Sequence, residues 1–337
     1  MPDANLADLA LLAEVTRGPL VESRHFGRVV AVDLAGRAAL ALGDTGRPIL
    51  PRSAIKPLQA LPTVALALER GLSLTDPEIA VMCASHAAEP FHLEAVRAVL
   101  ARAGATEADL HCGPHAPAHA AAAAALIAAG ESPRPIHNNC SGKHAGMLLM
   151  ARLLDAPLAD YWQPDHPVQR RIQDVLIRLA ALHGPPTWGT DGCAVPTYAL
   201  PLVGMARAFA QLTHPAGLPP AERAAAEAIR AAMNACPEHV SGTGTFHAAL
   251  LRAGRGRYLA KGGAEGCYAL GVVDPPLGLA LKIEDGAARA IPPVLLAALD
   301  RLGILTTAET EALHLWRVAD VLNTRGDRVG VIRAVLG

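Results

Sequence analysis

Hydrophobic positions along this chain change from strand-like to helical spacing and then back to strand-like spacing. Three leucines near the N-terminus recur every third residue and predict a short helix: Leu6, Leu9 and Leu12. The apolar runs 29–32 and 38–42 lie on either side of Leu34-Ala35-Gly36, and this pattern predicts a hairpin. A further short apolar run, 79–83, has the length and composition of a strand.

The middle of the chain has helical periodicity. The predicted helices cover 92–103, 116–129, 143–154, 168–182 and most of 196–235, with a proline-bounded loop at 215–220. Strand-like runs then return at 257–261, 267–273, 277–283 and 329–336, and a helix is predicted at 294–301.

Strands at both ends of the sequence that enclose a helical middle predict an α/β (α+β) fold. We expect one mostly antiparallel sheet assembled from N- and C-terminal segments and flanked by helices. Residues 1–337 are interpreted as a single unit, with the sheet in 1–90 plus 240–337 and a helix-rich part in 91–239.

Composition excludes several classes of function. The net charge is −1 and no basic cluster is present, so nucleic acid is not an expected partner. No apolar run reaches the roughly 20 residues needed to cross a bilayer. The N-terminus lacks the basic and apolar pattern of a secretory signal, which predicts a cytoplasmic protein. In that compartment the six cysteines should be free thiols.

Lysine is rare in this chain. Of the 30 basic residues only four are lysines: Lys56, Lys143, Lys261 and Lys282. A lysine can lose its proton when desolvated and act as a base or metal ligand, whereas arginine effectively cannot. A position that keeps lysine is therefore a candidate for chemistry, although chance survival in an arginine-rich composition explains any single one equally well.

The segment Ser53-Ala54-Ile55-Lys56 places a serine and a lysine three residues apart. On a helical turn both side chains share one face, so a neutral amine could take the serine proton and activate the oxygen for acyl attack. This is the S-x-x-K pattern of penicillin-binding proteins and β-lactamases. The alternative is that Ser53 only caps a short helix.

Lys261-Gly262-Gly263, at the end of a predicted strand, partly matches the K-T-G box of the same enzymes. Ser85 follows the apolar run 79–83 and is adjacent to His86. Adjacent residues of an extended chain point to opposite faces, so Ser85 needs a base from elsewhere, and Lys261 is the available one.

A possible metal site involves Cys140, which precedes a predicted helix, and Cys193 in Asp191-Gly192-Cys193. Either Lys143 or His144 could supply a further ligand on the first turn of that helix. Ordinary zinc preference favours His144, because lysine must first deprotonate. Buried thiols without any metal explain the cysteines equally well.

Taken together, these segments resemble the L-asparaginase II proteins of the rhizobial type. The matching stretches cover nearly the whole chain: Val21-Glu22-Ser23-Arg24-His25, Arg52 through Ala60, Cys83-Ala84-Ser85-His86, Cys112-Gly113, Asn139-Cys140-Ser141-Gly142-Lys143-His144, Asp191-Gly192-Cys193, Lys261-Gly262-Gly263-Ala264-Glu265-Gly266 and Lys282-Ile283-Glu284-Asp285-Gly286.

The resemblance implies a fold like that of serine β-lactamases and serine-dependent glutaminases, with hydrolysis of L-asparagine to aspartate and ammonia by a homodimer. It implies that Ser53 is the nucleophile with Lys56 as partner, and that Ser85 and Lys261 form a second pair. It also implies a Zn²⁺ that modulates substrate binding and is held by Cys140, Lys143 and Cys193, which replaces His144 as ligand. The implied substrate-binding residues are Arg52, Asn139, His144 and Asp191. Lys282 receives no role.

Two stretches depart from the family pattern. Ala87-Ala88-Glu89 stands where Ser-Gly-Glu is common, and Thr245 and His247 stand in a segment where relatives have an Arg and an Asp. Three alternatives therefore stay open: a glutaminase, another β-lactamase-like serine amidohydrolase, or a sensor that is acylated without turnover. One methylene separates glutamine from asparagine and is worth only about 1–3 kcal/mol in a pocket.

Overall fold

An eight-stranded antiparallel sheet is built from both ends of the chain in the computed structural model, which describes residues 8–336. Its spatial order is β11-β12-β1-β2-β10-β9-β8, and β3 pairs with β2. The N-terminal strands are β1 (Ala10–Arg17), β2 (Leu20–Val32) and β3 (Ala38–Leu42), and the C-terminal strands are β8 (Tyr258–Gly263), β9 (Cys267–Val272), β10 (Leu277–Ile283), β11 (Val318–Leu322) and β12 (Arg328–Ala334).

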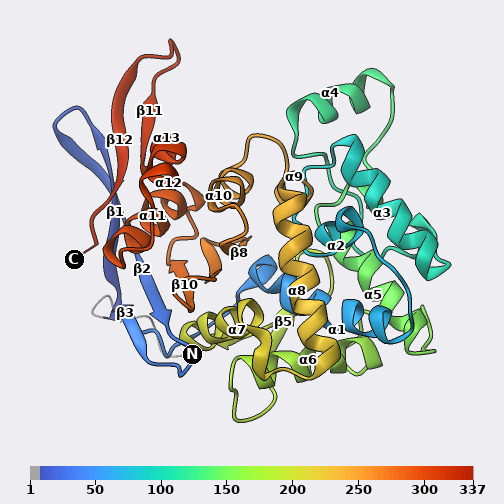
Figure 1. Ribbon diagram of the computed structural model, residues 1–337. Coiled ribbons are helices and arrows are strands. Elements are labelled where there is room, and N and C mark those ends of the chain that lie inside the picture. The colour runs from blue at the N-terminus through green and yellow to red at the C-terminus, as the bar shows by residue number, and fades with distance from the viewer. Residues whose placement is uncertain (1–7, 337) are drawn as a thin grey trace.

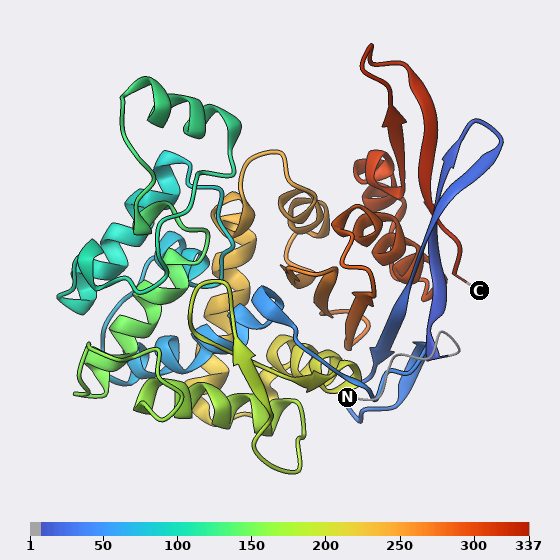
Figure 2. The same cartoon turned by 180° about the vertical axis from the view of Figure 1, so that it is seen from behind.

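Helices from the middle of the chain form a body beside this sheet (Figures 1 and 2). They are α1 (Lys56–Glu69), α2 (Asp76–Met82), α3 (Pro90–Ala103), α4 (Ala120–Ala128), α5 (Ser141–Leu153), α6 (Pro167–Leu179), α7 (Leu202–Thr213), α8 (Pro220–Ala235), α9 (Pro237–Ser241) and α10 (Phe246–Gly254). The C-terminal part adds α11 (Ile291–Arg301), α12 (Thr307–Ala312) and α13 (His314–Arg317), and two short pairs join β4 (Pro48–Ile49) to β7 (Leu200–Pro201) and β5 (Trp188–Thr190) to β6 (Pro196–Tyr198).

Helix α7 joins the helical body to the sheet by packing on β2, β9 and β10. The contact requires a glycine on β10, because a Cβ at Gly278 would lie 1.9 Å from the carbonyl oxygen of Ala206. Every residue of β9 is buried, so both faces of the sheet centre are covered. The C-terminal edge of β8 is thereby held next to the start of α1, where the candidate site lies.

The fold class expected from the sequence is confirmed, with strands at both ends of the chain and helices between them. The hairpin, the central helices and the strands near 257–283 and 329–336 also lie where the pattern places them, within a few residues. The proposed subdivision at residues 90 and 240 stays a prediction.

Three local expectations are wrong. Leu12 lies in β1 rather than in a helix, because pairing with β2 and β12 outweighs the spacing of the leucines, and Leu6 is outside the described residues. Residues 79–82 belong to helix α2 and Cys83 caps its end, whereas the apolar run concealed the capping box that Thr75 and Glu78 form at its start. The first residues of 196–235 form the short strands β6 and β7 instead of a helix.

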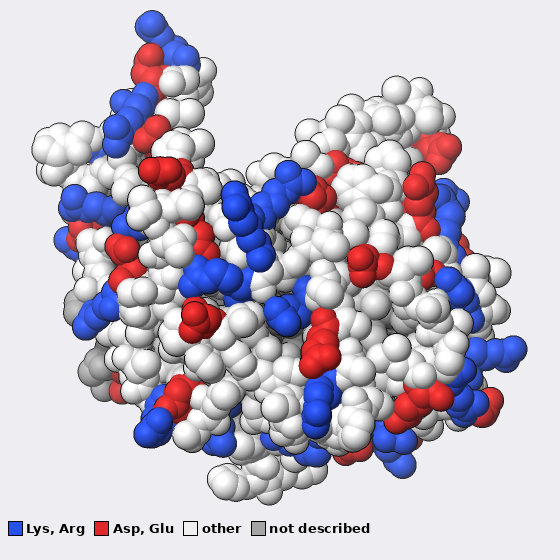
Figure 3. Space-filling view, viewed as in Figure 1, with Lys and Arg blue, Asp and Glu red and all other residues white. Residues whose placement is uncertain are grey.

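On the face shown in Figure 3, acidic and basic side chains are interspersed, and the surface is notched between the β11–β12 hairpin and the α4 region. Within residues 8–336, no helix combines the length and apolar character needed to span a membrane.

Candidate active site

The turn that carries Ser53 leads directly into helix α1. Arg52–Ile55 form one 3-10 turn, and the N–H of Lys56 donates to the carbonyl of Ser53. Pro57 is tolerated because the first N–H groups of a helix have no partner within it. Arg52 has φ +53°, a left-handed conformation that is unusual for a side chain larger than glycine. Such strained residues often occur at functional sites, and the turn that contains this residue lies against strand β8.

The amine of Lys56 is fully buried and points to the segment that follows α2. It donates hydrogen bonds to Ser85 Oγ at 3.1 Å, to the Asn139 carbonyl at 3.5 Å and to the Ala84 carbonyl. Among residues 8–336, the Ser53 hydroxyl has no hydrogen-bond partner, and Ser53 itself is half-buried. The Lys56 side chain therefore reaches Ser85 rather than the serine three residues before it.

Lys261 approaches the same hydroxyl from strand β8. Its Nζ donates to Ser85 Oγ at 3.0 Å and to the Gly262 carbonyl at 2.6 Å. Burial, together with the charge of Lys56, lowers the pKa of Lys261 well below the ordinary lysine value. The structure thus brings Ser85 and Lys261 together and adds Lys56 to them.

Gly263 allows β8 to lie directly against the Ser53 turn. A Cβ at this position would be 2.4 Å from the Pro51 carbonyl oxygen and 2.9 Å from the Ala54 nitrogen. The second glycine of Lys261-Gly262-Gly263 is therefore a packing requirement, and it brings the lysine of the strand close to the serine of the turn.

Backbone hydrogen bonds hold the Ser85 segment. Ser85 N–H donates to the Val240 carbonyl at 3.0 Å, and His86 N–H donates to the Asn139 carbonyl at 3.1 Å. His86 Nδ1 accepts from the Ala88 N–H, so its Nε2 carries the proton and donates to Ser141 Oγ at 2.8 Å. Ser85 and His86 do not bond to each other, as expected for adjacent residues of an extended segment.

Two thiols and one amine converge beside this cluster. Cys140 precedes helix α5, Lys143 is on its first turn, and Lys143 Nζ donates to Cys193 Sγ at 3.0 Å. A hydrogen bond between the two thiols lowers the pKa of Cys140 well below its usual value and raises that of Cys193. Burial opposes the charge on Lys143, but attraction to thiolate charge on the cysteine pair and to the Asp191 carboxylate outweighs burial and raises its pKa.

The convergence fits the donor set that the family resemblance implies for zinc. All three side chains are buried, which suits ligands that must shed water. Within the described residues, no group of three or more His, Cys, Asp and Glu side chains is arranged to hold a metal, so a site here depends on the lysine.

His144 lies behind the thiols and is fully buried. Tyr161 accepts from the His111 N–H at 2.9 Å, so its own hydroxyl donates to His144 Nδ1 at 2.6 Å. Burial, together with the charge of Lys143, lowers the pKa of His144 well below its usual value. Within residues 8–336, His144 Nε2 has no hydrogen-bond partner. His144 therefore packs next to the site as a buried residue and is not accessible to solvent.

The remaining expected substrate residues lie around the Ser53 turn. Arg52 Nε donates to Asp191 Oδ1 at 2.7 Å, and this carboxylate also accepts from the Gly192 N–H. Burial opposes the charge of Asp191, but Lys143 and Arg52 outweigh burial and lower its pKa. The Asn139 side chain is half-buried and makes no hydrogen bond with the described residues, which leaves its amide free for a ligand.

A single family profile accounts for almost the entire chain. The profile of the L-asparaginase II family matches residues 13–334, which include every residue of the site. The chain belongs to the L-asparaginase II family. This membership places it among the amidohydrolases.

Solved structures give weaker similarities. A β-lactamase from Mycobacterium bovis is 14% identical with a TM-score of 0.44, and the match covers 82% of this chain and 94% of that one. A protein named Mglu, crystallised in 4.3 M NaCl, is 16% identical with a TM-score of 0.47 over 83% of this chain and 62% of that one. These scores are too low to support a functional argument. The comparison with curated proteins gives no match.

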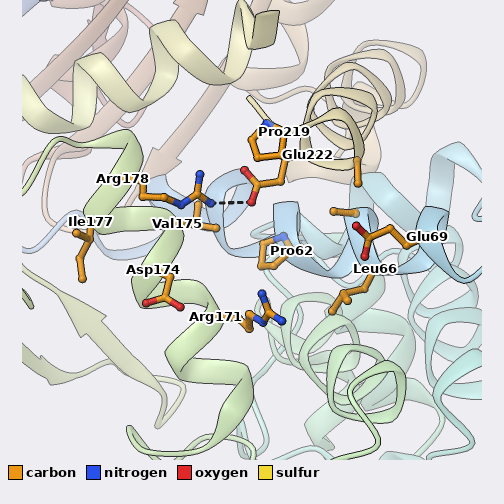
Figure 4. A pocket seen from close by; sticks show the side chains of 12 residues that line it. Pro62, Leu66, Glu69, Arg171, Asp174, Val175, Ile177, Arg178, Pro219 and Glu222 are labelled. Atoms are coloured by element: carbon orange, nitrogen blue, oxygen red, sulfur yellow. Dashed lines mark hydrogen bonds and ion pairs between the residues drawn. The ribbon is translucent and has the colours of Figure 1, made fainter. Parts of the chain in front are cut away.

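Two larger cavities lie apart from the lysine cluster. One of about 630 Å³ lies between α1, α6 and α8, where Arg178 and Glu222 form the ion pair of 2.6 Å drawn in Figure 4. Another of about 610 Å³ includes Arg52 and Lys282 in its wall. Lys282 Nζ donates to the carbonyls of Glu265 and Ile283 at 2.7 and 2.6 Å, which is a structural role for the fourth lysine.

Sequence reasoning missed the backbone partners of the site. The carbonyls of Ala84, Asn139 and Val240 fix Lys56 and the Ser85 segment, and no side-chain pattern reports them. Glycine pairs are a usable signal for such close approaches, and Gly262-Gly263 provides one.

Proposed function

We propose that this protein is an L-asparaginase that hydrolyses L-asparagine to L-aspartate and ammonia through a serine nucleophile. The observation that supports the proposal is the convergence of Lys56 and Lys261 on Ser85 Oγ, at 3.1 and 3.0 Å, next to the Ser53 turn. Two lysines and two serines are a complete set of groups for acyl transfer, because they provide a nucleophile, a base and a proton relay.

Ser53 is the nucleophile in this proposal, because its hydroxyl is unbonded and partly exposed while that of Ser85 is held between two amines. Ser53 Oγ bonds to the amide carbon, and its proton passes to Lys56, whose amine must first be unprotonated and turn from Ser85 toward Ser53. As the C–N bond breaks, Lys56 passes a proton through Ser85 to the departing nitrogen, which leaves as ammonia. Water then cleaves the ester, releases aspartate and restores Ser53.

Lys261 keeps Ser85 in place for this relay. Two ammonium groups that share one acceptor repel each other, and burial removes the water that would screen them. The lowered pKa of Lys261 reflects both effects, so a neutral Lys261 can hold Ser85 without opposing a protonated Lys56.

Substrate recognition is assigned to the groups around the Ser53 turn. Arg52 can receive the α-carboxylate of asparagine and Asp191 its ammonium group, because the two side chains already form an ion pair of matching charges. The free amide of Asn139 supplies a further hydrogen bond. His144 orders this pocket from beneath through Tyr161.

Cys140, Lys143 and Cys193 are the residues that would hold a zinc ion in this proposal. When bound, the ion would supply a positive charge that attracts the substrate carboxylate and orients it. Lys143 must give up its proton to become a ligand, and the two thiols must be thiolates. The serines and lysines already provide nucleophile and base, so the metal is expected to affect affinity more than the chemical step.

Ammonia release from asparagine and glutamine, together with the colour change of a chromogenic β-lactam, tests the proposed activity. Sustained release from asparagine supports it, preferential release from glutamine makes the protein a glutaminase, and a single stoichiometric burst makes it an acylated sensor. Mass spectrometry of acid-quenched enzyme locates the acyl group. We expect it on Ser53, and an acyl group on Ser85 would reverse the roles of the two serines. The cytoplasmic location and the homodimer stay predictions.

A further inference from the structure

Glu89 is a buried carboxylate that fastens a distant loop to the Ser85 segment. It begins helix α3 and is only 6% exposed. Its Oε1 accepts the Thr243 N–H at 2.8 Å, and its Oε2 accepts the Thr243 hydroxyl at 2.8 Å. A buried charge is costly unless it is hydrogen-bonded or paired, and these two bonds, together with His119 Nε2 at 3.7 Å from Oε2, make the placement of Glu89 tolerable.

The loop 240–245, which comprises the last two residues of α9 and the connection to α10, contacts residues 85–89. At one end the Val240 carbonyl accepts the Ser85 N–H at 3.0 Å. In the middle Gly242 has φ +128°, and a Cβ there would lie 2.8 Å from the Ala87 Cβ. At the other end Thr243 meets Glu89. Hydrogen bonds therefore join the loop to residues 85–89 on both sides of the contact between Gly242 and Ala87.

This attachment controls the backbone of the residue that both lysines contact. Lys56 comes from α1 and Lys261 from β8, and neither element contains Glu89 or Thr243. The Ser85 N–H has Val240 as its partner, so a shift of the loop would move Ser85 relative to two fixed amines. Displacements of about 1 Å can cost about 10²-fold in rate when they affect reacting groups.

We propose that Glu89 is a positioning residue for the Ser85 hydroxyl, which it places between Lys56 and Lys261 by clamping Thr243 and hence the loop 240–245. The inference rests on the proposed function, because Ser85 must take part in turnover for its position to matter. Glu89 itself does not touch the substrate or the lysines in this role.

Three variants test how strongly the two hydrogen bonds between Glu89 and Thr243 affect turnover. Glu89→Ala removes both bonds and is expected to lower kcat about 100-fold with KM changed less than about twofold. Thr243→Val keeps the N–H bond and should lower kcat about tenfold, in proportion to the single bond lost. Glu89→Gln should stay within about threefold of the parent, since an amide can accept the Thr243 N–H and donate to its hydroxyl.

A matched control is available in helix α12. Glu309 is also buried and also accepts the N–H and hydroxyl of one threonine, Thr306, at 2.8 and 2.9 Å, but its other partner is Arg257 rather than anything at the site. Glu309→Ala should lower Tm while the folded enzyme keeps its kcat. Hydrogen exchange at the Ser85 amide should speed up in Glu89→Ala and stay unchanged in Glu309→Ala.

The inference is overturned if Glu89→Ala lowers Tm alone, with kcat and Ser85 amide protection as in the parent. It is also overturned if Glu89→Gln is as slow as Glu89→Ala, because the charge rather than the clamp would then matter. Ser85→Ala separates this inference from the proposed function. Full turnover in Ser85→Ala refutes the proposed relay, whereas amide exchange still reports whether Glu89 holds Ser85.

Discussion

Lys56 and Lys261 share one hydrogen-bond acceptor, although one lies in the first quarter of the chain and the other in the last quarter. Both amines donate to Ser85 Oγ, at 3.1 and 3.0 Å, and both are buried. The relationship joins the first turn of α1 to the edge strand β8 and makes Ser85 the central hydroxyl of the site. Three of the five predictions that follow depend on this arrangement or on the elements that create it.

Replacing either lysine by arginine should abolish turnover. We expect kcat for Lys56→Arg and Lys261→Arg to fall at least about 10²-fold, which is the usual contribution of a positioned acid or base. Arginine keeps the charge but cannot accept a proton. Lys282→Arg is the matched control, since Lys282 only donates to backbone carbonyls, and it should retain activity. Steady-state ammonia release measures all three, and full activity in Lys261→Arg would refute the neutral-amine mechanism.

The activity should rise with pH through the pKa of Lys261. This pKa lies well below the ordinary value of 10.5, because burial and Lys56 disfavour the ammonium. At pH below it Lys261 is charged, and above it Lys261 is neutral and can hold Ser85 for the relay without repelling a proton on Lys56. A profile of kcat/KM should therefore show a limb that increases with pH and has its inflection well below 10.5. An increase only near 10.5 would show that Lys261 titrates as an ordinary lysine.

Gly263→Ala should separate β8 from the Ser53 turn. The added Cβ would lie 2.4 Å from the Pro51 carbonyl oxygen, so one backbone must move. We expect kcat to fall about 10²-fold because Lys261 moves with its strand. Gly184→Ala is the control, since a Cβ there meets nothing within 4 Å. Wild-type kcat in a folded Gly263→Ala protein would mean that the strand can adjust without moving Lys261.

Ala88→Gly should stabilise the protein. Ala88 is buried with φ +58°, a left-handed conformation that costs a side-chain residue about 1–2 kcal/mol. The greater freedom of glycine in the unfolded chain offsets part of this gain, so we expect a net increase of about 0.5–1 kcal/mol in the free energy of unfolding. Denaturant titration measures it. Ala224→Gly, on the exposed face of helix α8, should instead lose about 1 kcal/mol. Equal destabilisation by both changes would contradict the strain at Ala88.

Metal removal should weaken substrate binding more than the chemical step. Chelation is expected to raise KM several-fold and to leave kcat within about threefold, because the serine and lysine groups do not depend on the ion. Cys193→Ser should reproduce this effect and lower the zinc content measured by elemental analysis. The buried Cys267, whose thiol is near the Leu50 carbonyl, offers the control Cys267→Ser, which should keep its zinc. Protein purified without chelator that contains no zinc would exclude the site.

The sequence by itself determined the class of fold and the groups available for catalysis. Period-2 runs at the two ends and helical spacing between them are local properties, so they predicted a sheet that encloses a helical insertion. The scarcity of lysine marked Lys56, Lys143 and Lys261, because only lysine can lose its proton at these positions. The wrong assignments at Leu12 and at 79–83 occurred where strand pairing or a helix cap outweighed a short apolar pattern.

Only the tertiary structure decided which serine each lysine contacts. The spacing of Ser53 and Lys56 suggested a local pair, but the Ala84 and Asn139 carbonyls draw the Lys56 amine toward Ser85. Those carbonyls belong to segments far away in the sequence. Because every residue carries the same backbone carbonyl, no pattern of residue types can predict which carbonyls will contact the Lys56 amine. The Glu89–Thr243 clamp is of the same kind, because loop closure over 154 residues is specified by the packing of the whole helical body.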